Sequence, residues 1–473
     1  MNSDGIGTTP MVSSVAASLG GDVAAWPYAR PKHSELRARQ RRTYWRRRAV
    51  VFACLAAVVA GSGWLIVVPG ARAFVASNDR DTLRLAHVRV PSLVPLVPGV
   101  TKIPGTVPRL PFVSTGQSAV LVRGVGFLGA TPGETSVPIA SVTKVMTAVI
   151  VLEDHPLDNG NGPVFTMTAV DHEAWTQAVA NGDSSLEVIA GERLTERQLL
   201  EALMIPSADN IADYLARWDA GSIPAFVRKM NAMAASLGLS ETHYADASGV
   251  NPGSRSTAID QAILGAYAMA VPGLISVEDH AYMRFPVEGT VPSYNPVVGQ
   301  DGVIGLKSGF TDAAQICLVT AARRKVGDRI VLVVAVTLGQ PSSLAGAGDI
   351  DLQLLNAATA DLGVHQILAS FEPVATVSAG WSAKALDVYV PAHMTVVAWA
   401  GLTITTAVKT SVPVAPGAGR GWTPGTKMGT VEISSPAAIE AAEPVRLNGF
   451  LPSAPPGWSP GATTTLTTAS GSS

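Results

Sequence analysis

The sequence predicts a mixed helix-and-strand domain followed by a small β domain, with one membrane-spanning helix near the start of the chain. Strand and helix patterns alternate over residues 112–363, short β-branched runs separated by Gly and Pro fill residues 364–451, and residues 49–69 carry no charge. A chain of 473 residues has room for these parts, since a domain takes about 100–200 residues.

The N-terminal region combines a basic run with an apolar one. The net charge is −2, but arginines and lysines crowd into residues 30–48, directly before the uncharged residues 49–69. A basic run can be a nucleic-acid-binding arm. A helix of about 20 apolar residues, however, crosses a bilayer, and its positive flank stays in the cytoplasm. We therefore expect residues 1–48 to be a disordered cytoplasmic tail and residues 49–69 a single-pass anchor in the cell membrane. No nucleic-acid partner is expected, and the rest of the chain would be extracytoplasmic.

A cleaved signal peptide is the alternative for this region. Signal peptides have an apolar stretch of about 7–15 residues followed by a small-x-small cleavage site. The plausible site here is Ala71-Arg72-Ala73, but the apolar stretch is longer than in signal peptides. A retained anchor is favoured.

Residues 70–111 follow and are rich in proline, above all from Pro91 to Pro111. Such segments favour extended conformations and act as semi-rigid spacers. We expect this linker to hold the next domain away from the membrane.

Hydrophobic periodicity places the elements of residues 112–363. They are, in chain order, a strand at 116–126, a helix at 141–154, two helices within 194–218 broken near Pro206, a buried strand at 328–339 and a helix at 348–363.

The C-terminal part changes in character. Residues 364–451 read as a small all-β domain, and residues 452–473, rich in Pro, Ser, Thr and Gly, as a disordered tail. The two cysteines are Cys54, inside the apolar stretch, and Cys317. No intramolecular disulfide and no cysteine metal site are expected.

A first chemical motif lies at the start of the predicted helix 141–154. Ser141 and Lys144 are three residues apart, so a helix places both on one face. A serine hydroxyl needs an adjacent base to become a nucleophile, and a lysine amine can be that base when burial or a second cation disfavours its charge. In isolation, Ser-x-x-Lys is more often a helix cap and a solvated lysine.

Two further motifs follow in the chain. Lys307-Ser308-Gly309 offers a cation and a hydroxyl for a carboxylate, and a glycine that lets a substrate backbone approach. Between the two lysine motifs, Ser207-Ala208-Asp209-Asn210 follows the break at Pro206 and can supply a second hydroxyl. Each motif also has a purely structural interpretation: Lys307-Ser308-Gly309 as a surface turn, and Ser207-Ala208-Asp209-Asn210 as a helix N-cap.

The three motifs occur in the order Ser-x-x-Lys, Ser-x-Asn-like, Lys-Thr-Gly-like, which is the set of penicillin-binding proteins and class A β-lactamases. The surrounding phrases resemble the D-alanyl-D-alanine carboxypeptidases, the low-molecular-mass penicillin-binding proteins of the β-lactamase/transpeptidase-like superfamily. The resemblance covers residues 115–365 and rests on IASVTKVMTA, LLEALMIPSADNIADYLA, MNAMAASLGLSETHYADASG, STAIDQAILG and GLKSGFTDAAQICLVTAARR.

The resemblance implies an α+β fold, with a five-stranded antiparallel sheet, helices on both faces and an all-helical lobe. It implies a serine peptidase that trims the terminal D-alanine from peptidoglycan stem peptides and is inhibited covalently by β-lactams. Neither a cofactor nor a metal is implied. The sequence leaves the oligomeric state and the role of the β domain open.

Roles follow residue by residue from the resemblance. Ser141 would be the nucleophile, Lys144 its base and Ser207 the proton shuttle to the leaving D-alanine. The backbone N–H groups of Ser141 and Phe310 would form the oxyanion hole, and the substrate would be held by Lys307, Ser308, Gly309, Phe310, Asp209 and Asn210.

Three positions depart from the family pattern. Ser308 replaces a threonine and keeps the hydroxyl, and Gln315 replaces a glycine. Asp209 stands where the family has asparagine, and its carboxylate would add negative charge beside both lysines. Either this slows catalysis, or a local shift lets Asn210 take the asparagine's place.

Other patterns and rival functions fit less well. Gly124–Gly129 matches G-x-G-x-x-G, but a loop follows it instead of the helix that a dinucleotide site requires. His172-Glu173 begins like a zinc helix, yet Thr176 stands where the second histidine belongs. Two rivals remain: an inert relative that binds cell-wall peptide without turnover, because of Asp209, and a β-lactamase.

A class A β-lactamase uses a glutamate to activate the deacylating water. Between Asn210 and Lys307, none of the glutamates is followed by asparagine at the spacing of that family; they are Glu241, Glu278 and Glu288. The carboxypeptidase is therefore favoured.

Overall fold

A computed structural model describes residues 92–158, 160–382, 384–413 and 420–455. The expected tail 1–48 and membrane anchor 49–69 lie outside these ranges, as does most of the expected tail 452–473. Over the described ranges, no helix combines the length and the apolar character needed to cross a bilayer.

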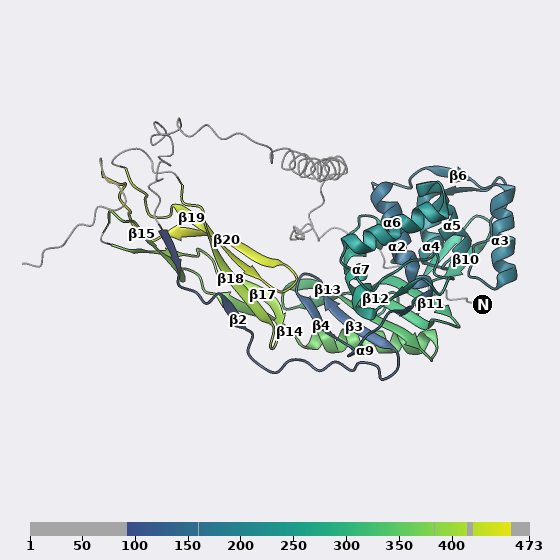
Figure 1. Cartoon of the computed structure of the whole chain (residues 1–473), viewed down its shortest axis with the longest axis horizontal. Coiled ribbons are helices and arrows are strands. Elements are labelled where there is room, and N and C mark those ends of the chain that lie inside the picture. Colours follow the sequence, from purple (N-terminus) through teal and green to yellow (C-terminus); the bar gives the residue numbers. More distant parts are fainter. Residues whose placement is uncertain (1–91, 159, 383, 414–419, 456–473) are drawn as a thin grey trace, which may run out of the picture. The chain divides into compact units, whose positions relative to one another are not determined.

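An antiparallel sheet of five strands forms the centre of the first domain (Figure 1). Its strands are, in spatial order, β11 (Val303–Thr311), β12 (Gln315–Val326), β13 (Arg329–Gln340), β3 (Gln117–Val122) and β4 (Gly126–Ala130). All neighbouring pairs are antiparallel. The strands expected at 116–126 and 328–339 are confirmed as β3 and β13.

The sheet is covered on both faces because its strands are apolar on both. Ala119 and Leu121 belong to one hydrophobic cluster, which includes helix α7 (Ala258–Ala268). The alternate residues of the same strand join a second cluster with helix α9 (Leu344–Ala360). Side chains alternate between the two faces of a strand, so α7 and α9 lie on opposite faces, as Figure 1 also shows.

A helical lobe lies beside the sheet and is built around α2 (Lys144–Asp154). This helix is buried continuously from Lys144 to Leu152, as expected of a helix that is apolar all round. The surrounding helices are α3 (Ala169–Asn181), α4 (Glu196–Met204), α5 (Asp209–Ala220) and α6 (Ile223–Ser236). The helix break predicted near Pro206 is confirmed, since α4 ends at Met204 and α5 begins at Asp209.

Short elements complete this domain. They are β5 (Val137–Pro138), the 3-10 helix η1 (Ala140–Thr143), β6 (Val164–Thr166), β7 (Arg193–Thr195), β8 (Arg255–Ser256), α8 (Leu274–Glu278), β9 (Tyr282–Phe285) and β10 (Gly289–Pro292).

The following β domain was also predicted. Its strands are β14 (Leu362–Leu368), β15 (Pro373–Ser378), β16 (Leu386–Tyr389), β17 (Met394–Trp399), β18 (Thr403–Thr410), β19 (Lys427–Ser434) and β20 (Ile439–Leu447). Strands β14 and β17 pair with each other, and the remaining five belong to a seven-stranded sheet.

The two outer strands of that sheet correct the interpretation of residues 92–102 as part of a spacer. β1 (Ser92–Pro95) pairs with β15, and β2 (Val100–Lys102) pairs with β18. Proline cannot donate a ladder hydrogen bond and is therefore confined largely to edge strands. Pro95 is compatible with such an edge position, and Pro98 lies between the two strands.

One carboxylate is buried between the sheet and α9. Asp351 is fully buried and accepts hydrogen bonds from the hydroxyls of Thr320, at 2.7 Å, and Thr337, at 2.5 Å. Burial raises the pKa of Asp351 to about 7 against the opposing effect of the two hydroxyls. The folded protein therefore holds a proton that the unfolded chain releases near pH 4.

We predict that Asp351→Asn removes a pH-dependent loss of stability. A raised folded-state pKa contributes stability that is present below the unfolded pKa and disappears as the pH rises to about 7. The melting temperature of the parent should fall between pH 5 and pH 8 relative to that of the variant. Asp349→Asn, at an exposed position of the same helix, is the control and should follow the parent. Parallel curves for parent and Asp351→Asn would contradict the prediction.

Candidate active site

The first expected pair is brought together at the start of α2. Ser141 lies in η1, and Lys144 is the first residue of α2. The Nζ atom of Lys144 is 2.8 Å from the Oγ atom of Ser141, and the lysine is completely buried. The three-residue spacing thus places an amine in direct contact with a hydroxyl.

Lys144 contacts three oxygens. Besides Ser141 Oγ, its Nζ lies 2.9 Å from the backbone carbonyl oxygen of Ser248 and bonds to the Asp209 carboxylate. The three N–H groups of an ammonium match these three acceptors. A neutral amine can donate to Ser248 and Asp209 and accept the proton of Ser141 in place of the third bond. The same geometry therefore serves before and after proton transfer.

Asp209 and Asn210 face different parts of the structure. Asp209 contacts Lys144, whereas the Asn210 side chain pairs with the backbone of Leu186, accepting from its N–H at 3.1 Å and donating to its carbonyl at 3.0 Å. The Asp209 carboxylate is therefore the group beside the Lys144 amine. The Asn210 amide does not take that place and instead binds the loop that contains Leu186. Burial raises the pKa of Asp209, and the Lys144 ammonium opposes this.

Ser207 lies in the turn between α4 and α5. Its backbone has φ 65°, a left-handed conformation that is uncommon outside glycine. Its side chain is buried, and within the described residues its Oγ has no hydrogen-bond partner. A buried hydroxyl without a partner costs stability, so this group is available to a bound molecule.

The third motif lies on β11, directly against Ser141. A Cβ atom added at Gly309 would lie 2.7 Å from the backbone nitrogen of Ser141, so only glycine fits at that position. Ser308 Oγ donates a hydrogen bond to the carbonyl of Tyr294 at 2.8 Å, and the Lys307 ammonium donates to the carbonyl of Ser308 at 2.8 Å. Phe310, next along the strand, is 55% exposed.

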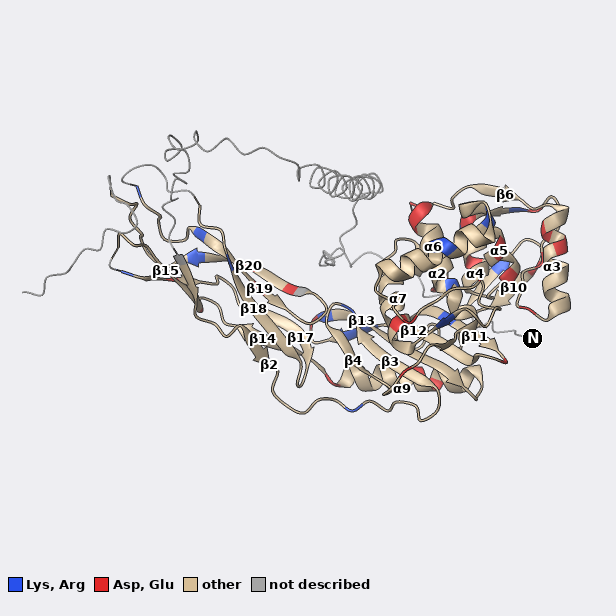
Figure 2. Cartoon of the chain, viewed as in Figure 1, with Lys and Arg blue, Asp and Glu red and all other residues tan. Residues whose placement is uncertain are grey.

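The two lysines share one electrostatic environment. Burial, together with repulsion from Lys144, lowers the pKa of Lys307 to about 7, while Asp209 and Glu278 act in the opposite direction. In Figure 2, charged residues are frequent on the helical lobe and sparse on the strands of the β domain. The fold thus brings both lysines to one buried site.

Sequence reasoning missed the segment that supplies the third contact of Lys144. Asp246 accepts hydrogen bonds from the N–H groups of Gly249 and Asn251 and thereby shapes the loop that presents the Ser248 carbonyl. A Cβ at Gly249 would lie 1.8 Å from the carbonyl oxygen of Ala140. Backbone atoms give no residue-type signal; only the phrase ADASG, already part of the resemblance, marks this loop.

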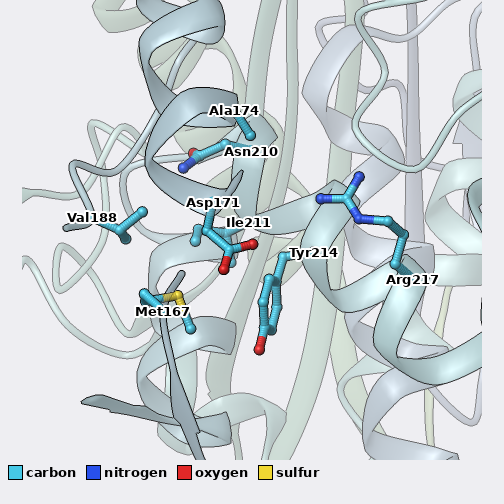
Figure 3. Close-up of a pocket in the computed structure, with 8 residues that line it drawn as sticks. All are labelled: Met167, Asp171, Ala174, Val188, Asn210, Ile211, Tyr214 and Arg217. Atoms are coloured by element: carbon cyan, nitrogen blue, oxygen red, sulfur yellow. The ribbon is translucent and has the colours of Figure 1, made fainter. Parts of the chain in front are cut away.

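A small hollow lies near this site, between α3 and α5 (Figure 3). Asp171, Tyr214 and Arg217 face it, and Asn210 lies at its margin. The other lining residues are Met167, Ala174, Val188 and Ile211. It has no room for a water-sized molecule and is lined by none of the three serines or two lysines of the motifs.

The family of D-alanyl-D-alanine carboxypeptidases matches residues 119–340. The chain is 35% identical over 205 residues to D-alanyl-D-alanine carboxypeptidase DacB2 of Mycobacterium tuberculosis, a match that covers 41% of this chain and 65% of that protein. It is 28% identical to DacF of Bacillus subtilis over 46% of this chain and 56% of that protein. It is also 30% identical to the D-alanyl-D-alanine carboxypeptidase of Streptomyces sp. strain K15, over 47% of this chain and 80% of that protein. The chain thus matches less than two thirds of the first two relatives.

Solved structures show the same fold. D-alanyl-D-alanine carboxypeptidase DacD from Francisella tularensis superposes with a TM-score of 0.52 at 19% identity, covering 74% of this chain and 97% of that one. Penicillin-binding protein 5 from Haemophilus influenzae gives 0.53 at 20% identity, covering 73% and 99%. At this identity the likeness concerns the fold, and it confirms the expected transpeptidase-like architecture.

We predict that Gly249→Ala destabilises the protein far more than Gly191→Ala. Both glycines have a left-handed backbone, with φ 89° and 93°, so each substitution costs about 1–2 kcal/mol for conformation. Only Gly249 lies against the Ala140 carbonyl, because nothing is within 4 Å of a Cβ at Gly191. Urea unfolding should show a larger loss at Gly249. Equal losses would mean that the loop does not press on the turn that holds Ala140 and Ser141.

Proposed function

This chain belongs to the D-alanyl-D-alanine carboxypeptidase family, and on that premise we propose that it releases the terminal D-alanine of peptidoglycan stem peptides through an acyl-enzyme on Ser141. The observation that carries the proposal is the 2.8 Å contact between Lys144 Nζ and Ser141 Oγ. The contact joins a base to a hydroxyl, which is what nucleophilic catalysis by serine requires. The same buried site also holds a second lysine.

Acylation begins at the hydroxyl of Ser141. Its oxygen forms a bond to the carbonyl carbon of the penultimate D-alanine while its proton passes to Lys144. The oxyanion is stabilised by the backbone N–H groups of Ser141 and Phe310, and such a donor typically contributes about 10²–10³ in rate. The carbon–nitrogen bond then breaks as Ser207 donates its proton to the nitrogen of the departing D-alanine and takes a proton from Lys144, which leaves Lys144 neutral again.

In deacylation, water is the nucleophile and Ser141 is the leaving group. Water adds to the ester carbon, its proton goes to Lys144, and the ester bond to Ser141 breaks. The serine oxygen takes that proton back from Lys144, and the shortened peptide releases its acid proton to the solvent and leaves as a carboxylate. β-Lactams would acylate Ser141 in the same way and act as covalent inhibitors.

Recognition of the substrate carboxylate falls to the third motif. Lys307 has a pKa near 7 because it is buried beside another lysine, and an arriving carboxylate would stabilise its charged form. Ser308 now donates to Tyr294, so its hydroxyl must turn from that carbonyl to donate to the substrate. Gly309 leaves room for the peptide backbone.

The location follows from the substrate. Peptidoglycan lies outside the cytoplasm, and the basic residues 30–48 before the uncharged residues 49–69 support an anchor with its N-terminus inside. We place the catalytic domain on the outer side of the cell membrane.

A second candidate function is an inert relative that binds cell-wall peptide without turnover. The contact between Asp209 and Lys144 favours it, because a carboxylate stabilises an adjacent ammonium, and an ammonium cannot accept the proton of Ser141.

We predict D-alanine release from diacetyl-lysyl-D-Ala-D-Ala by the parent and none by Ser141→Ala. The parent should also form a stable adduct with a fluorescent penicillin, which Ser141→Ala cannot form. Rapid turnover of the drug would instead indicate a β-lactamase. A parent that neither releases D-alanine nor becomes labelled would refute the carboxypeptidase.

Asp209→Asn should raise D-alanine release at neutral pH, on the order of tenfold, which corresponds to about 1.4 kcal/mol. The amide keeps a contact to Lys144 without stabilising an ammonium. Asp349→Asn, at an exposed position of α9, is the control and should leave the rate near that of the parent. A silent parent that gains activity in Asp209→Asn would establish the inert relative. Loss of the parent's activity in Asp209→Asn would show that the carboxylate itself takes part.

A further inference from the structure

A second buried carboxylate lies beside the third motif. Glu278, the last residue of α8, is 3% exposed, and neither of its carboxylate oxygens has a hydrogen-bond partner within the described residues. Burying an unpaired carboxylate is costly unless a positive charge lies nearby or the group takes up a proton. A nearby cation would therefore favour the charged form of Glu278.

The geometry identifies Lys307 as that cation. A Cβ atom added at Gly305 would lie 2.3 Å from Glu278 Oε2, so the carboxylate reaches the backbone of β11 at this point. Gly305 and Lys307 are two residues apart on β11, and the charge of Lys307 acts on Glu278. Because Gly305 has no side chain, the carboxylate can lie directly against the backbone of β11, two residues from Lys307.

Several other charged groups lie on the elements around Glu278 and Lys307. Lys307 is influenced by Lys144 on α2, Asp209 on α5 and Glu278 on α8. α4, which packs on α8, carries Glu196, Arg197 and Glu201; the Arg197 guanidinium is bonded to the carbonyl of Gly160 and to Ser276. β12 places the neutral Cys317 and Val319 opposite Gly309 and Lys307.

We propose that Glu278 is a positioning residue that keeps Lys307 charged for the substrate carboxylate, an inference that rests on the proposed function. Burial and Lys144 lower the pKa of Lys307, and Glu278 raises it. In return, Lys307 opposes the strong upward effect of burial on the pKa of Glu278. Without Glu278, Lys307 would release its proton at a lower pH and bind a carboxylate less well.

The first test is the pH dependence of D-alanine release by Glu278→Gln. The alkaline limb of kcat/KM should move to lower pH by about one unit, the usual minimum effect of an adjacent opposite charge. The change should appear in KM more than in kcat, because Lys307 binds the substrate. Glu196→Gln is the matched control: Glu196 is 1% exposed with an unpartnered oxygen, but is not among the groups that influence Lys307. The alkaline limb of kcat/KM for Glu196→Gln should lie at the same pH as that of the parent.

The second test needs no activity and so separates this proposal from the proposed function. Melting temperatures are compared for the parent, Glu278→Gln, Lys307→Met and the double variant at pH 6. The double variant should lose less than the sum of the single losses, because each single variant leaves one buried group uncompensated. Additive losses, or an alkaline limb that does not move in an active enzyme, overturn the proposal. If the parent releases no D-alanine, the proposed function fails and the melting cycle alone decides on Glu278.

Discussion

The buried contact of Lys144 with Ser141 is the interaction on which the site depends. It requires that a lysine amine be held among three oxygens inside a helical lobe, where an unmatched charge is costly. Each oxygen comes from a different part of the chain: η1, the start of α5 and the loop that Asp246 shapes. The lobe and the sheet position these parts relative to one another, so the fold serves to place one nitrogen.

Charge in this site is balanced between two lysines and two carboxylates. Lys144 and Lys307 repel each other. Two carboxylates on different helices, Asp209 and Glu278, offset this repulsion. The balance explains how an aspartate can stand where the family has an asparagine. Burial disfavours the charged form of Asp209, so the charge of Asp209 depends on the lysines. The charge of the lysines depends in turn on Asp209.

The sequence predicted the parts of this site whose signal lies in side chains. The Ser141–Lys144 spacing, the helix break near Pro206 and the apolar strands follow from local patterns, and the structure has all three. It could not decide between Asp209 and Asn210, because that choice depends on how α5 is rotated against α2. The carbonyl of Ser248 was missed because backbone atoms carry no signal. Residues 92–102 were taken for a spacer because proline suits both extended linkers and edge strands.

The most direct test of the central claim is the acylation rate of Ser141 by benzylpenicillin, followed by intact-protein mass spectrometry in the parent and in Lys144→Ala. The parent should gain the mass of one drug molecule, mapped to the peptide that contains Ser141. Lys144→Ala should react at least about 10²-fold more slowly, the usual contribution of a positioned base. Equal rates in the two proteins would show that Lys144 does not activate the serine and would contradict the account.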